Sequence, residues 1–77
     1  MKYRINVFLK NNVFDPQGNA IMRVLHNLGY KSVNDVRVGK VFLIDISEDS
    51  ENIIKKISED VFSNPVIEKF EIEKLEG

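Results

Sequence analysis

The spacing of apolar residues changes along this chain from every second residue to helical spacing and back again. Residues 2–10 alternate between apolar and polar side chains, which is typical of a strand with one buried face. Residues 16–28 and 50–62 carry apolar side chains at the spacing of an amphipathic helix. Short apolar runs at 33–38, 41–46 and 66–72 predict further strands. A chain with this pattern must bury two helical stripes against one sheet.

The resulting β-α-β-β-α-β order predicts an α+β fold. We expect a two-layer sandwich of the ferredoxin-like kind, with an antiparallel sheet and both helices on one face. A chain of 77 residues forms a single domain, residues 1–77, with a thin core. Small cores are commonly supplemented by disulfides, metals or partner subunits. This chain has no cysteine and one histidine, so a partner subunit is the supplement that remains. Residues 35–46 fit either a hairpin or one bent strand.

Local signals place the helix ends. Asp15 followed by Pro16 is typical of an N-cap and a first helical residue, and Gly29 is typical of the left-handed residue after a helix. His26 lies opposite the apolar stripe, so we expect it to face solvent or a partner. Residues 47–50 offer N-caps for the second helix, whose predicted stripe is Ile53, Ile54, Ile57 and Val61.

The second face of the sheet is predicted to be more apolar than a solvent-exposed face needs to be. Phe8 interrupts the polar side of the first strand, and Val41 and Leu43 make the 41–46 strand apolar on both sides. Two helices that cover one face cannot also cover the other. We therefore expect Phe8, Val41 and Leu43 to form a self-association surface.

Charge and composition argue against several classes of partner. The net charge of −1 gives no general attraction to nucleic acid or anionic lipid. Residues 37–43 contain basic residues and a glycine, but one phenylalanine where an RNA-recognition motif has several aromatic residues. The sequence has neither a signal-peptide pattern nor an apolar run approaching the ~18 residues of a membrane span. We expect a cytoplasmic protein with no nucleic acid and no membrane partner.

No arrangement of reactive residues predicts catalysis by the chain alone. The serines have only His26 as a histidine base and lack a glycine-rich elbow. Asp15, Asp35 and Asp45 are explained by a helix cap, a turn and an outward-facing strand position. The phosphate-binding GxxxxGK pattern is absent. The sequence therefore predicts no catalytic, cofactor-binding or metal-ligating residues.

Two segments contain residues that the fold alone does not require. Gly18 lies early in a helix, where glycine costs about 1 kcal/mol relative to alanine, so it serves either close packing or an approaching partner chain. Arg37 and Lys40 flank Gly39 at a strand end. They fit a solvated turn, salt bridges to the chain's many glutamates, or contacts with a partner subunit or its bound anion.

Four short segments occur in a specific order and spacing: DPQG at 15–18, LHNLGY at 25–30, VRVGK at 36–40 and NPVIE at 64–68. Through them the chain resembles, end to end, the PurS family, the small subunit of phosphoribosylformylglycinamidine synthase. The candidate partner contacts lie within these segments. They are Asp15, Pro16, Gly18, Arg37, Gly39, Lys40, Asn64 and Pro65.

The resemblance implies a non-catalytic role in de novo purine biosynthesis. A glutaminase subunit of such a complex releases ammonia, and a synthetase subunit uses ATP to add it to the formylglycinamide ribonucleotide amide. The small subunit is expected to bridge these two partners and to assist ammonia transfer. It is expected to bind no cofactor itself, whereas the assembled complex is expected to use ATP and Mg. It is also expected to form a homo-dimer or tetramer. The alternative is a small dimeric regulatory module that binds an amino acid or a nucleotide.

Overall fold

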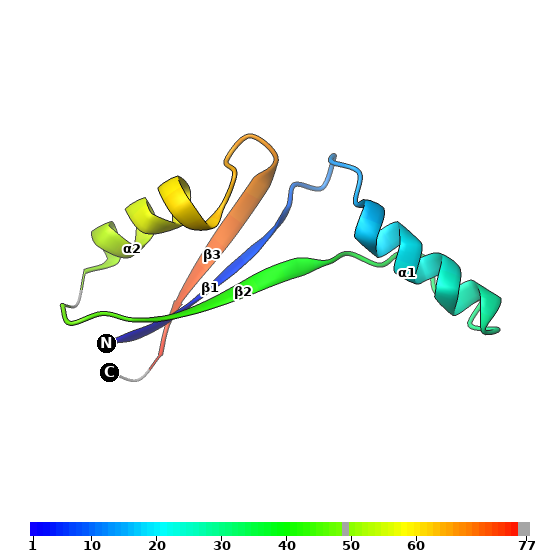
Figure 1. Ribbon diagram of the computed structural model, residues 1–77, viewed down its shortest axis with the longest axis horizontal. Helices are drawn as coiled ribbons and strands as arrows, with labels where there is room; N and C mark the ends of the chain where they lie inside the picture. The colour runs from blue at the N-terminus through cyan, green and yellow to red at the C-terminus, as the bar shows by residue number, and fades with distance from the viewer. Residues whose placement is uncertain (49, 76–77) are drawn as a thin grey trace.

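A computed structural model describes residues 1–48 and 50–75 of the protein; positions 49, 76 and 77 lie outside the described residues. The described elements follow one another along the chain as a strand, a helix, a strand, a helix with a π-helical end, and a strand. Figure 1 shows the helix α2 over one face of the sheet and the helix α1 projecting beyond its end. The α+β class is confirmed. The elements are β1 (Lys2–Leu9), α1 (Pro16–Asn27), β2 (Gly39–Asp45), α2 (Glu51–Ile57), η1 (Ser58–Phe62) and β3 (Glu68–Lys74).

The sheet has the strand order β2-β1-β3, and both pairs are antiparallel. Its central strand β1 follows the predicted alternation, because Tyr3, Ile5 and Val7 are fully buried on the face toward α2. Ile5 lies opposite Phe42 of β2 and Ile72 of β3, so the three strands present one continuous apolar face. This face is the core of the molecule.

The helix α2 covers that face. Ser50 caps it by accepting a hydrogen bond from the Ile53 backbone N–H at 3.3 Å, and Ile54 is fully buried against β1. The π-helical end η1 closes with a bond from the Ser63 N–H to the Ser58 carbonyl at 3.0 Å. A π-helical turn contains more residues than an α-helical one, so the face that meets the sheet shifts along the sequence.

This shift corrects the predicted stripe at its last position. Val61 is 72% exposed, and Phe62 packs against the core instead. The Phe62 ring stacks on Phe42 of β2, with ring centroids 4.2 Å apart. The prediction that Val61 faces the core is wrong because it assumed an α-helical repeat up to the end of the helix.

The helix α1 begins and ends where the sequence predicts. Pro16 is its first residue, and Gly29 follows its C-cap with φ of 101°. Its position differs from the prediction, because α1 does not lie over the sheet (Figure 1). The stripe that was expected to meet the sheet is between 44% and 68% exposed at Ile21, Val24 and Leu28.

Two further predictions about this region are wrong. Residues 33–38 form no strand; they run beside α1, where the His26 ring lies 2.7 Å from the Val33 carbonyl oxygen in a hydrogen bond. His26 therefore faces this segment rather than solvent or a partner. Because the Val38 N–H bonds to Asp15 instead of a strand, β2 begins at Gly39 and no hairpin forms within 35–46. The described sheet has three strands instead of four.

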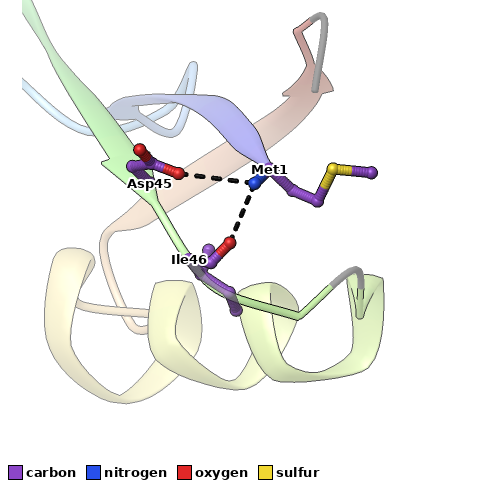
Figure 2. Close-up of polar contacts among 3 residues, drawn as sticks. All are labelled: Met1, Asp45 and Ile46. Atoms are coloured by element: carbon purple, nitrogen blue, oxygen red, sulfur yellow. Dashed lines mark hydrogen bonds and ion pairs between the residues drawn. The ribbon is translucent and has the colours of Figure 1, made fainter.

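The two ends of the sheet differ. At one end, shown in Figure 2, the N-terminal ammonium of Met1 donates to the Ile46 carbonyl at 2.9 Å and lies 3.4 Å from an Asp45 carboxylate oxygen. The Leu75 N–H bonds to the Lys2 carbonyl at 2.8 Å, so both ends of the described chain are fastened there. Within residues 1–48 and 50–75, no helix has the length and apolar character needed to cross a membrane.

Candidate functional site

Three of the four sequence motifs meet at the other end of the sheet, where α1 begins. The 15–18 and 36–40 segments are joined by a hydrogen bond from the Val38 N–H to the Asp15 carboxylate. The 64–68 segment is joined to the β1–α1 loop by a bond from the Lys10 N–H to the Ile67 carbonyl at 2.9 Å. The 25–30 segment lies at the far end of α1. We call the residues that hold this end together the sheet-end cluster: Asp15, Gly18, Arg37, Lys40 and Glu68.

Asp15 is the buried centre of the sheet-end cluster, with only 5% of its surface exposed. One carboxylate oxygen accepts from the Gly18 N–H at 2.8 Å and the other accepts from the Val38 N–H at 2.7 Å. These two bonds, together with the positive charge of Arg37, lower the pKa of the Asp15 carboxyl below its usual range. The ionised side chain therefore caps α1 and also fixes the segment that leads into β2.

Gly18 is buried against the chain's own backbone. A β-carbon at this position would overlap the carbonyl oxygen of Val36 and lie 2.9 Å from the Asp15 carboxylate. The close-packing interpretation of Gly18 therefore explains its place in the helix. The space beside it is filled from within the chain, so it offers no bare backbone to a partner.

Arg37 braces the loop between β1 and α1. Its guanidinium donates to the Lys10 carbonyl at 3.0 Å and to the Val13 carbonyl at 3.1 Å. The side chain remains exposed. Arg37 thus holds the two connections of α1 against one another while part of it faces outward.

Lys40 and Glu68 form an ion pair across the end of the sheet, with 3.8 Å between the ammonium and a carboxylate oxygen. The other Glu68 oxygen accepts from the Asn64 N–H at 2.7 Å. Sequence reasoning missed Glu68, although its place four residues after Asn64, in a turn that contains Pro65, is a usable signal for a side chain that closes the turn. Since the Lys40 side chain is mostly exposed, the pair is worth at most about 1 kcal/mol.

A hollow of about 640 Å³ opens between the start of α1 and the sheet. Val7, Leu9 and Val38 are among its apolar lining residues, and charged members of the sheet-end cluster lie around them. Gly39 also lines it, and a β-carbon there would come within 2.9 Å of the Val7 carbonyl oxygen. An apolar concavity with few polar groups is typical of a surface that receives another group.

The predicted self-association residues share the face of the sheet opposite α2. Val41 and Leu43 lie opposite Asn6 and Arg4 of β1, with exposed fractions of 60% and 71%. Phe8 is partly covered by the Lys69 ammonium, which lies 5.0 Å from its ring centroid. All three side chains therefore lie on the sheet face that the sequence predicts, and their role in self-association stays a prediction.

These features define a small α+β chain with exposed apolar surfaces and a braced loop cluster at one end of its sheet. The family described as PurS: Phosphoribosylformylglycinamidine (FGAM) synthase matches residues 2–76. The chain belongs to this PurS family.

Individual relatives agree over nearly the whole length. The phosphoribosylformylglycinamidine synthase subunit PurS of Archaeoglobus fulgidus is 40% identical over 72 residues, covering 88% of this chain and 90% of that protein. The Bacillus subtilis PurS structure matches with a TM-score of 0.82 and 37% identity, covering 95% and 98% of the two chains. A chain of the Thermotoga maritima PurLQS structure matches with a TM-score of 0.83 and 33% identity, covering 96% and 95%.

Proposed function

We propose that this chain acts as a non-catalytic bridge in phosphoribosylformylglycinamidine synthase. It joins the glutaminase subunit to the synthetase subunit in the cytoplasm and assists the transfer of ammonia between them. ATP and Mg then belong to the synthetase rather than to this chain. The observation that carries the proposal is the likeness over 96% of the chain to a chain of the Thermotoga maritima PurLQS structure.

We further propose that the exposed members of the candidate contacts bind a partner subunit. The buried residues Asp15 and Gly18 do not contact the partner but hold the surrounding loops in place. The exposed members are Pro16, Arg37, Gly39, Lys40, Asn64 and Pro65. Lys40 gives the most direct test, because Arg37 also holds the β1–α1 loop. Lys40→Ala should weaken binding to the two larger subunits without unfolding the chain, whereas Lys55→Ala on α2 should leave binding unchanged.

The bridging role is tested by reconstitution from separate subunits. Glutamine-dependent amidine formation requires ammonia made at one site to reach another, whereas ammonium-driven formation requires only the synthetase site. Omission of this chain should abolish glutamine-dependent turnover, and high external ammonium should restore much of it. Adding the chain back in steps should restore glutamine-dependent turnover to saturation at a fixed stoichiometry.

A different result would contradict a role that is limited to bridging. If ammonium-driven turnover falls as far as glutamine-driven turnover when the chain is omitted, the chain must shape the synthetase site. Turnover by the isolated chain would contradict the non-catalytic role directly. Both measurements use the same preparations of the two larger subunits and this chain, so the turnover rates can be compared directly.

The hollow at the sheet end favours one second candidate, a regulatory module that binds an amino acid or a nucleotide. Its volume of about 640 Å³ is in the range of small-molecule sites. Calorimetric titration of the isolated chain with glutamine and ATP distinguishes the candidates. Saturable binding at micromolar concentration supports the module, and its absence together with capture of the larger subunits supports the bridge.

A further inference from the structure

Two loops at the sheet end expose large apolar side chains, although connecting loops are usually polar. In the loop before α1, Phe14 is 70% exposed. In the loop before β3, Val66 is 77% exposed and the neighbouring Ile67 is also exposed. Figure 1 shows both loops at the same end of the sheet, and the bond from the Lys10 N–H to the Ile67 carbonyl joins them. We call Phe14, Val66 and Ile67 the loop-end surface.

Phe14 lies between two residues that are fixed. The Val13 N–H bonds to the Lys10 carbonyl at 2.9 Å, and the Val13 carbonyl accepts from Arg37 at 3.1 Å. On the other side, Asp15 is buried, and its carboxylate accepts from two backbone N–H groups. The exposed ring is therefore presented to solvent by a rigid loop. Because little backbone freedom remains to be lost on binding, this arrangement favours affinity for a partner.

The turn that carries Val66 is fixed as well. The Asn64 side-chain oxygen accepts from the Val66 N–H at 3.1 Å, and the Asn64 N–H donates to the Glu68 carboxylate at 2.7 Å. The Asn64 carbonyl also accepts from the Ile67 N–H at 3.1 Å. Packing in the core does not explain Phe14 or Val66, since most of each residue is exposed. The two loops thus hold apolar side chains in place for which folding alone gives no reason.

The exposed charges at this end of the sheet are mainly positive. Arg37, Lys40 and Lys69 are exposed. The acidic groups among them are covered, since Asp15 is buried and the Glu68 side chain is only 13% exposed. A surface that complements this end is therefore acidic. Two copies of this chain that met through the loop-end surface would bring like charges together, so the occupant is a different chain.

We propose that Phe14 inserts into an apolar pocket with carboxylates around its rim, on one of the two larger subunits. Val66 and Ile67 pack beside the ring, and the exposed cations face the carboxylates. Aromatic side chains in desolvated pockets carry a large share of the binding energy of interfaces, whereas charges at the rim mainly speed association. This contact rests on the bridging role proposed above, and it adds residues that the sequence did not single out.

The first test removes the ring. Phe14→Ala should raise the dissociation constant for one larger subunit by roughly tenfold or more, mainly through faster dissociation. Val66→Ala should raise the same constant by roughly fivefold. Val61→Ala makes the same substitution at a valine of nearly equal exposure on η1 and should leave the constant unchanged. Surface plasmon resonance with each larger subunit immobilised separately measures these constants.

The other outcomes reject the contact and differ in what else they reject. If Phe14→Ala binds both larger subunits as wild type does, the loop-end surface is not the contact, while the bridging role stands. If wild type binds neither larger subunit, both the contact and the bridging role are rejected. If Phe14→Ala lowers the sedimenting mass of the isolated chain and leaves subunit binding unchanged, the loop-end surface lies between copies of this chain instead.

The second test concerns the rim. Lys69→Glu reverses an exposed charge and should slow association with the same subunit by roughly threefold or more at low salt, with little effect on dissociation. Raising the ionic strength should reduce the difference, since exposed charges are screened by salt. Lys55→Glu makes the same reversal on α2 and should associate at the wild-type rate. Association of Lys69→Glu as fast as that of wild type, or faster, would show that the receiving surface is not acidic and would overturn the proposed contact.

Discussion

At the scale of single residues, Asp15 has the most consequences. A helix cap needs one carboxylate oxygen, and Asp15 uses the second to hold Val38, which lies far along the sequence. One buried side chain therefore couples the start of α1 to the start of β2. Any change that removes its charge affects both the helix and the path of the chain into the sheet.

We expect Asp15→Asn to make the stability of the protein less dependent on pH in the acid range. The folded pKa of Asp15 is lowered, so its stabilising effect is present above the unfolded value of about 3.9 and is lost as the pH falls through the folded value. The Asp15→Asn variant should be less stable than wild type at pH 7, and the difference should shrink toward pH 3. Urea unfolding across this range measures it.

Asp35→Asn is the matched control, since Asp35 is exposed. It should leave the slope of stability against pH close to that of wild type. A parallel pair of pH profiles for wild type and Asp15→Asn would show that the bonds to Gly18 and Val38 do not hold the ionised carboxylate.

Gly18→Ala should destabilise the protein although alanine is the better helix former. The preference for alanine is worth about 1 kcal/mol, but the added carbon would overlap the Val36 carbonyl, and overpacking costs about 1–3 kcal/mol. We expect a net loss of about 1 kcal/mol in the free energy of unfolding. Gln17→Ala, at the exposed neighbouring position, should change it by less than about 0.5 kcal/mol.

At the scale of elements, the local signals predicted β1 and both ends of α1 because each depends on neighbours in the sequence. The alternation of β1 and the Asp15-Pro16 cap need only a few adjacent residues. Residues 33–38 failed as a strand because Asp15 and His26, more distant in sequence, bond to them. Periodicity alone does not report that such bonds compete with sheet pairing.

The candidate site was predicted in part for the same reason. Gly39 and Lys40 were found as a strand end, and their proximity to the 64–68 segment follows from the pairing of β1 with both neighbours. Glu68 was missed because its role depends on that proximity. The direction of α1 was not predictable either, since the bonds of Arg37 to two loop carbonyls help to set it.

The π-helical end of α2 gives a prediction of its own. Phe62→Ala removes the stack on Phe42 and part of the core, so the free energy of unfolding should fall by about 2 kcal/mol. Val61→Ala should lower it by about 0.5 kcal/mol or less, because Val61 faces outward. Urea unfolding of the two variants decides which residue faces the sheet. A larger effect at Val61 would restore the α-helical register that the sequence predicted.

At the scale of the whole molecule, two apolar surfaces point in different directions. The exposed stripe on α1 consists of the aliphatic side chains of Ile21, Val24 and Leu28, and no charged residue belongs to it. The outer face of the sheet sets Val41 and Leu43 among charged neighbours such as the Arg4–Glu73 pair, whose side chains are 3.0 Å apart. The surface with more charged groups should give the weaker contact, since those groups lose water on binding.

Contacts through these two surfaces should therefore dissociate at different protein concentrations. We expect the chain to form homo-oligomers, so wild type should sediment at four times the 8.9 kDa chain mass when concentrated and at twice that mass on dilution, because contacts through the outer sheet face dissociate before contacts through the α1 stripe do. Leu43→Asp places an unpaired charge between the sheet faces and should hold the protein at two chains at all concentrations. Val61→Asp adds the same charge to a valine of nearly equal exposure on η1, away from both surfaces, and should retain the four-chain species. If Leu43→Asp instead reduced the protein to single chains, the outer sheet face would be the principal interface, and the α1 stripe would be the secondary one.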